Sequence, residues 1–118
     1  MIWLVIGLGG SLGAISRYGV SHLLKPYTNY FPYATFLVNL TGSFLFGVIL
    51  GMGFDRESTG YLFFSAGFLG SFTTFSTFSY ETVQLFNQKE FIKSFVYAGL
   101  HLLISISVAG LGYFIAHF

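Results

Sequence analysis

Four long apolar runs, separated by short polar connections, constrain this chain more than any other feature. Charged residues make up 8% of its 118 residues, whereas soluble globular domains carry about 25%. A membrane-crossing helix needs about 20 apolar residues, and the runs fit that length over residues 2–24, 34–54, 61–86 and 91–118. The sequence therefore predicts an all-α membrane protein with four transmembrane helices, forming one domain over the whole chain.

The connections between these runs are short and carry most of the charge. The first starts at Lys25 and continues through a polar-aromatic patch at residues 27–33, the second is residues 55–60, and the third is residues 87–90. Loops this short force neighbouring helices to run antiparallel, so both termini should lie on one side. Lysine and arginine favour the first and third connections by three or four to one, which mildly favours external termini.

Composition also excludes several classes of protein. The net charge of +1 provides no basic face for nucleic acid, and the lack of cysteine excludes disulfides and thiolate metal sites. His22, His101 and His117 lack the spacing of metal ligands, and no serine has a plausible histidine and aspartate pair. We therefore expect neither an enzyme nor a nucleic-acid-binding protein.

The third run contains the most unusual segment, residues 65–79. Seven of its fifteen residues carry hydroxyls, and Phe72, Phe75 and Phe78 recur among them every three residues. A lipid-facing helix has no use for so many hydroxyls, whereas a water-lined or protein-buried polar path does. The segment therefore predicts such a path.

The same segment predicts that the third helix is broken in the middle of the membrane. Gly67, Gly70 and the hydroxyl residues through Thr74 weaken the helical hydrogen-bond ladder. A break there exposes backbone carbonyls, which suit a small hard cation such as Na⁺.

Small residues recur four positions apart in the first two runs. Gly9 and Gly13 form one such pair, and Ser43, Gly47 and Gly51 repeat the spacing. This pattern allows helix backbones to approach closely in lipid. It fits packing within one chain and packing between two chains.

Isolated polar residues in the first two spans have two interpretations each. An embedded arginine is costly unless paired or snorkelling. Arg17 therefore either anchors the end of its helix near the interface or has an electrostatic role, in which it attracts anions towards a vestibule or bonds to broken backbone. Asn39 either has a structural role, in which it caps a neighbouring helix or holds the bundle together, or donates its amide hydrogens to a passing anion.

The last two spans carry further candidates. Phe75 and Phe78 share a helix face, and they either pack in the core or present their positive ring edges to an anion. Tyr97, His101 and Ser105 form a polar stripe, which serves either interhelical bonding or a permeating solute. Glu81 closes the hydroxyl-rich segment and lies in a vestibule or pairs with a cation.

Three motifs together resemble the Fluc/CrcB fluoride channel family. They are GGSLGAISRY at residues 9–18, TFLVNLTGSFLFG at residues 35–47 and GFLGSFTTFSTFS at residues 67–79. The resemblance covers the whole chain in length, number of spans and motif order. It implies a channel in the inner (plasma) membrane that exports cytoplasmic fluoride passively and so protects the cell. It also implies a dual-topology dimer of antiparallel protomers.

The resemblance also assigns roles to residues. It implies a Na⁺ at the centre of the dimer, held by the backbone carbonyls of Gly70 and Thr73 from each protomer. Arg17 and Glu81 match the family's first-span arginine and the acidic residue after the phenylalanine motif. The implied fluoride pore contains Asn39, Thr74, Phe75, Ser76, Thr77, Phe78, Tyr97 and Ser105. His101 lies on the same polar track, where a histidine is less typical of the family.

Several alternatives remain at this point. A dual-topology protein ideally has almost no lysine and arginine bias, so the mild bias here leaves a heterodimer with a homologue open beside the favoured homodimer. A small multidrug-type exporter also has four short spans, but it requires a glutamate in the first span, and the first run has no acidic residue. A scaffold subunit without transport of its own fits the polar segment of the third span poorly.

Overall fold

The computed structural model describes residues 1–27 and 32–118, so part of the predicted first connection, residues 28–31, lies outside the described residues. Within these two ranges the only regular structure is helix. The helices are α1 (Ile2–Leu23), η1 (Lys25–Tyr27), α2 (Tyr33–Gly51), α3 (Thr59–Leu62), the π-helix η2 (Phe63–Leu69), α4 (Gly70–Phe72), α5 (Phe75–Asn87) and α6 (Phe91–His117).

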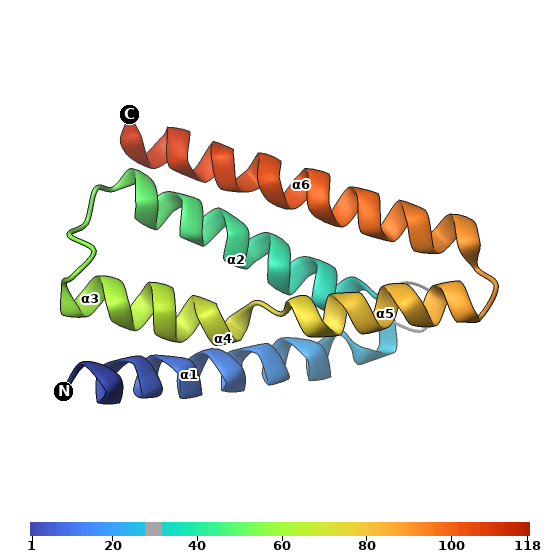
Figure 1. The fold of residues 1–118 in the computed structure, drawn as a ribbon, viewed down its shortest axis with the longest axis horizontal. Coiled ribbons are helices and arrows are strands. Elements are labelled where there is room, and N and C mark those ends of the chain that lie inside the picture. Colours follow the sequence, from blue (N-terminus) through green and yellow to red (C-terminus); the bar gives the residue numbers. More distant parts are fainter. Residues whose placement is uncertain (28–31) are drawn as a thin grey trace.

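These helices form four rods that match the four predicted runs in number and order (Figure 1). The third rod consists of α3, η2, α4 and α5 in succession. Neighbouring rods run antiparallel, and both chain ends lie at the same end of the molecule, as the short connections predicted. The described chain measures 47 × 31 × 20 Å.

Length and composition fit an apolar environment. Helices α2 and α6, of 19 and 27 residues, are long and apolar enough to cross a membrane, and the 22 residues of α1 extend about 33 Å at about 1.5 Å per residue. Large apolar side chains cover the outside, as at Trp3 (81% exposed) and Ile106 (71% exposed). An exterior of this kind suits lipid better than water.

Helix α2 packs along α6 through its small residues. Gly47 lies against the carbonyl oxygen of Ala109 on α6. One turn further, Gly51 lies against the carbonyl oxygen of Tyr113. A Cβ atom at either glycine would collide with that backbone, so the small-residue repeat of the second run serves packing within the chain.

The small residues of α1 serve the third rod in the same way. Gly9 lies against the carbonyl oxygen of Phe63, and Gly13 lies against that of Phe68. Ser71 donates a hydrogen bond to the carbonyl oxygen of Gly10, which ties α4 to α1. The first half of the third rod is therefore fixed to α1.

The third rod is interrupted at Thr73 and Thr74. Helix α4 ends at Phe72, and both threonines have extended backbone, with φ, ψ of −78°, 156° and −147°, 117°. Thr74 is the N-cap of α5, because its Oγ1 accepts a hydrogen bond from the Thr77 amide at 3.2 Å. The interruption thus lies at the end of the segment that the sequence indicated.

The two glycines expected to weaken this rod are themselves helical. Gly70 has φ, ψ of −60°, −34°, and Gly67 lies inside η2. Gly67 instead permits close approach to α1, since a Cβ atom there would lie 2.7 Å from the carbonyl oxygen of Ile6. Threonine capping, rather than glycine flexibility, accounts for the interruption.

Candidate functional site

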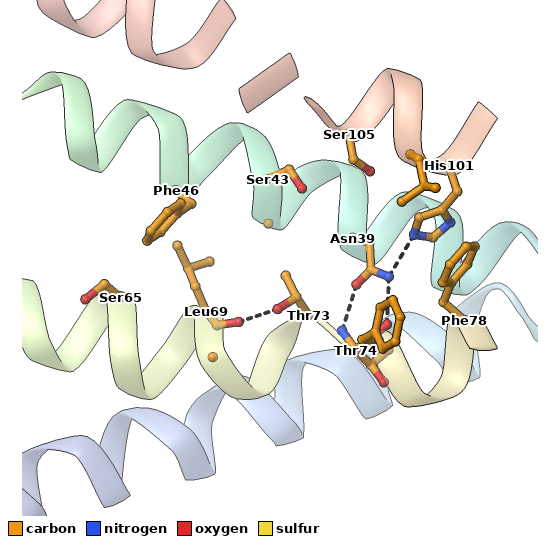
Figure 2. Close-up of a pocket in the computed structure, with 14 residues that line it drawn as sticks. Asn39, Ser43, Phe46, Ser65, Leu69, Thr73, Thr74, Phe78, His101 and Ser105 are labelled. Carbon is orange, nitrogen blue, oxygen red and sulfur yellow. Dashed lines mark hydrogen bonds between the residues drawn. The ribbon is translucent and has the colours of Figure 1, made fainter. Parts of the chain in front are cut away.

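The interruption is held by the side chain of Asn39 on α2. The Thr74 amide donates a hydrogen bond to Asn39 Oδ1 at 2.7 Å, and Asn39 Nδ2 donates to the Thr74 carbonyl oxygen at 2.8 Å. Figure 2 shows this pair of bonds beside the polar face of α6. We call it the Asn39–Thr74 clamp. The side chain thereby replaces the helical acceptor that the Thr74 amide lacks and adds a donor to the Thr74 carbonyl.

His101 of α6 is the second partner of the Asn39 amide. Asn39 Nδ2 lies 2.9 Å from His101 Nε2, and both side chains are buried. An amide has two donor hydrogens, and both are now engaged. Asn39 therefore acts as a cap and a bundle contact in this structure, which is the first of its two sequence interpretations.

Aromatic rings surround the imidazole of His101. The Phe78 ring centroid lies 4.1 Å from that of His101 at an interplanar angle of 32°. Tyr97 lies 5.4 Å from both rings, and Phe36 meets His101 edge-on at 5.7 Å. Phe78 is 7% exposed, whereas Phe75 is 75% exposed. The two phenylalanines share a helix face but differ sharply in environment.

A cavity of about 390 Å³ opens beside this cluster. Its walls come from α2, the interrupted third rod and α6. Phe75 and Leu102, which line it, are 75% and 51% exposed, so a single chain leaves the cavity open on one side. Predicted site residues in its wall are Asn39, Gly70, Thr73, Thr74, Phe75, Phe78 and Ser105, together with His101.

A second cavity, of about 220 Å³, lies on the α1 side of the interruption. Arg17 lines it, as do the hydroxyl residues Ser21, Thr35 and Thr77. Thr74 lines both cavities, so it forms part of the wall between them. Arg17 thus lines the second cavity and not the first.

The remaining predicted residues lie around these two cavities. Ser76 is exposed in the first turn of α5, with its Oγ 3.4 Å from Thr74 Oγ1. Tyr97 is fully buried against Phe78. Glu81 accepts a hydrogen bond from Thr35 Oγ1 across the α2–α5 contact. The structure therefore separates these three from the wall of the first cavity.

Thr35 is a site residue that the sequence analysis did not single out. It lies four positions before Asn39 on α2, so both side chains point to the same face. It also lines the second cavity. Two features of the sequence could have indicated Thr35: its position four residues before Asn39, and the need of Glu81 for a hydrogen-bond donor within an apolar span.

Backbone carbonyls at the interruption are suited to a cation. In a continuous helix the Thr74 amide would donate to the Gly70 carbonyl, and the Thr77 amide to the Thr73 carbonyl. Here the Thr74 amide donates to Asn39 Oδ1, and the Thr77 amide donates to Thr74 Oγ1. Both predicted carbonyls have therefore lost the helical donors that would compete with a metal ion.

The fold and the site together define a class: a helical membrane protein with a cavity, lined by both polar and apolar side chains, beside an interrupted helix. Comparison with known proteins then identifies the family. The profile described as "CrcB-like protein, Camphor Resistance (CrcB)" matches residues 4–113.

Curated relatives agree over nearly the full length. "Fluoride-specific ion channel FluC 2" of Bacillus cereus is 46% identical, covering 92% of each chain. "Fluoride-specific ion channel FluC" of Dehalococcoides mccartyi is 40% identical over 92% of this chain and 87% of the relative. The protein of that name from Pyrococcus abyssi is 39% identical over 96% and 94%. This chain belongs to the CrcB family.

Proposed function

We propose that this chain is a fluoride-selective ion channel that exports cytoplasmic fluoride passively. Relatives with the name fluoride-specific ion channel cover nearly the whole chain, and their names favour a channel over an enzyme or a small multidrug-type exporter. The observation that carries the proposal is the Asn39–Thr74 clamp, because it fixes a helix interruption between two cavities that both have polar side chains in their walls.

The wall of the first cavity suits a small, tightly hydrated anion. Such an ion must exchange water for other donors, yet it must also leave. The predicted pore residues in this wall are uncharged: Asn39, Thr74, Phe75, Phe78 and Ser105. Ring edges and hydroxyls attract an anion without the strength of a full charge. We assign the passage from one cavity to the other to the neighbourhood of Thr74.

The predicted residues that do not line the first cavity would attract anions towards it or hold its lining residues in place. Arg17 attracts anions into the second cavity, which Thr77 also lines. Ser76 and Thr77 offer hydroxyls in the first turn of α5. Tyr97 supports the Phe78 ring from behind, and Glu81 is held in place by Thr35.

A Na⁺ ion at the Gly70 and Thr73 carbonyls would complete the channel. Two carbonyls from one chain are too few for a hard cation, which takes several oxygen ligands. A second, antiparallel copy would supply two more, and Gly70 is exposed on the surface of the chain, where a partner can reach it. The bound ion would supply a fixed positive field that favours anions.

The same partner would close the open side of the first cavity. We therefore infer a dual-topology dimer that crosses the inner (plasma) membrane several times, with the third helix interrupted at mid-membrane. A homodimer is the simpler assembly, and a heterodimer with a homologue is the alternative that the lysine and arginine bias keeps open. The exposed apolar side chains face lipid in either assembly.

Growth of fluoride-sensitive bacterial cells tests this function in its setting. Cells that lack their own fluoride exporter should regain growth in millimolar fluoride when they express this chain. Cells that express Phe78→Ile at equal membrane abundance should not. Equal growth with and without the chain, at verified abundance, would contradict export by this polypeptide alone.

A further inference from the structure

The orientation of the Asn39 amide is fixed by the backbone of Thr74. The Thr74 amide can only donate, so it must face Asn39 Oδ1, and the Thr74 carbonyl can only accept, so it must face Asn39 Nδ2. A rotated amide would place two donors together and two acceptors together. The nitrogen that lies 2.9 Å from His101 Nε2 is therefore Nδ2.

This orientation determines the protonation of His101. The nitrogen of an amide donates hydrogen bonds and does not accept them, so His101 Nε2 must be the acceptor and carries no hydrogen. A neutral imidazole has one hydrogen on its two nitrogens. That hydrogen must then be on Nδ1.

The surroundings of His101 hold the ring in this place. The side chain is 4% exposed, and the Phe78 ring packs on it at 4.1 Å while Phe36 meets it edge-on. Within the described part of the chain, His101 Nδ1 is buried without a hydrogen-bond partner. The bond to Asn39 is thus the only hydrogen bond found for this imidazole among residues 1–27 and 32–118.

We propose that His101 is a positioning residue, whose unprotonated Nε2 holds the Asn39 amide in the orientation that keeps the third rod interrupted. The histidine acts on the ion path through Asn39 and Thr74, while its proton resides on Nδ1. This inference rests on the proposed function, in that the interruption lies on the path of the ion.

Nitrogen NMR of the reconstituted protein tests the protonation directly. The variant His22→Gln/His117→Gln removes two exposed histidines and leaves His101 as the only one. The ¹⁵N spectrum should show a neutral imidazole protonated at Nδ1. In the further variant Asn39→Asp the amide hydrogens are gone, so the proton should move to Nε2, where it can face the carboxylate. A parent spectrum with the proton on Nε2 would overturn the proposal.

A matched pair of substitutions separates the two nitrogens in function. The Gln side chain places its terminal oxygen near the position of Nε2, whereas the Asn side chain reaches only as far as Nδ1. His101→Gln therefore keeps an acceptor for Asn39, and His101→Asn does not. Both variants lose the ring that packs on Phe78, so the ring effect is common to them.

Fluoride flux from liposomes should separate the pair. His101→Gln should retain flux within about threefold of the parent, and His101→Asn should lose at least about tenfold, as expected when a buried donor is left unsatisfied. Ser107→Ala, which removes an exposed hydroxyl bonded within α6, should change neither flux nor stability. Equal flux in the two His101 variants, or greater flux in His101→Asn, would overturn the positioning role.

The two readouts also separate this inference from the proposed function. A parent protein that conducts no fluoride but shows the Nδ1 proton, with its shift in Asn39→Asp, would contradict the channel and support the positioning role of His101. A conducting parent with the proton on Nε2 would contradict the positioning role of His101 and support the channel.

Discussion

The side chain of Asn39 forms two hydrogen bonds with the backbone of Thr74, at 2.7 Å and 2.8 Å. The two residues lie on different rods, α2 and the third rod, and 35 positions apart in the chain. Because a backbone segment outside a helix must find other partners, this contact makes the interruption of the third rod a fixed feature. The clamp therefore links the packing of α2 to the proposed ion path.

Removal of the clamp should destabilise the protein and reduce flux. Asn39→Ala leaves the buried Thr74 amide without its acceptor, at a cost of about 1–3 kcal/mol, and it also removes one of the donors to the Thr74 carbonyl. Thermal unfolding in detergent should shift to clearly lower temperature. Thr41→Ala, a change at an exposed position of the same helix, should leave the transition unchanged. An Asn39→Ala protein as stable as the parent would show that the clamp contributes nothing.

Replacement of Phe78 should stop flux without loss of assembly. Phe78→Ile keeps an apolar side chain at a buried position, but it removes the aromatic ring that packs on His101. Fluoride flux should fall at least about tenfold, equivalent to about 1.4 kcal/mol in the barrier. Size-exclusion chromatography should show an unchanged dimer.

The control for Phe78 is a phenylalanine on the outside of the same rod. Phe64→Ile alters a ring that is 54% exposed, and it should retain parental flux. Parental flux in Phe78→Ile would remove this residue from the pore.

Gly70 provides a test of the proposed dimer and its cation. Within residues 1–27 and 32–118 of one chain, a Cβ atom at Gly70 would meet only the carbonyl oxygen of Ser65, at 3.7 Å, so Gly70→Val should leave the fold of the chain intact. A loss of dimer in this variant would then arise from the contact between chains. We expect a reduced dimer fraction and a loss of the effect of Na⁺ on dimer stability.

Gly13→Ala is the matching control, because it should disrupt packing within one chain and not between chains. A Cβ atom there would collide with the backbone of Phe68 in the same chain, so the folded monomer itself should be lost. Gly99→Ala, at an open position, should be neutral. Unaltered dimer yield and Na⁺ dependence in Gly70→Val would contradict the assignment of its carbonyl.

Arg17 should attract anions by charge rather than by shape. It lines the second cavity, and a charge near a protein surface acts on an ion with about 1 kcal/mol or more. Arg17→Gln should lower flux about fivefold at low ionic strength and less at high ionic strength, because salt screens the charge. Arg17→Lys should retain most flux, and Arg56→Gln in the exposed loop should retain all of it. Equal losses in the Lys and Gln variants would assign Arg17 a structural role.

The sequence predicted the architecture well because membrane helices follow directly from apolar length. The four runs correspond to the four rods, and the hydroxyl-rich segment of the third run contains the interruption. Glycine was a poor guide to its position. Gly67 and Gly70 are helical, and the chain leaves the helix where Thr74 caps α5 instead.

The partners within the site were harder to predict. Asn39 was singled out, but its main partner is the backbone of Thr74, and a backbone group leaves no trace in the sequence. The bond between Thr35 and Glu81 joins residues 46 positions apart, so it depends on how α2 meets α5. Such contacts follow from rod packing, which the apolar pattern alone does not specify.

Fluoride efflux from liposomes that contain only this purified polypeptide tests the central claim most directly. Liposomes loaded with potassium fluoride or potassium chloride would receive valinomycin to carry the counter-ion, and ion-selective electrodes would record each anion outside. The account predicts rapid fluoride release with negligible chloride release. Equal release of both anions would contradict selectivity, and no release from folded, dimeric protein would contradict a self-sufficient channel.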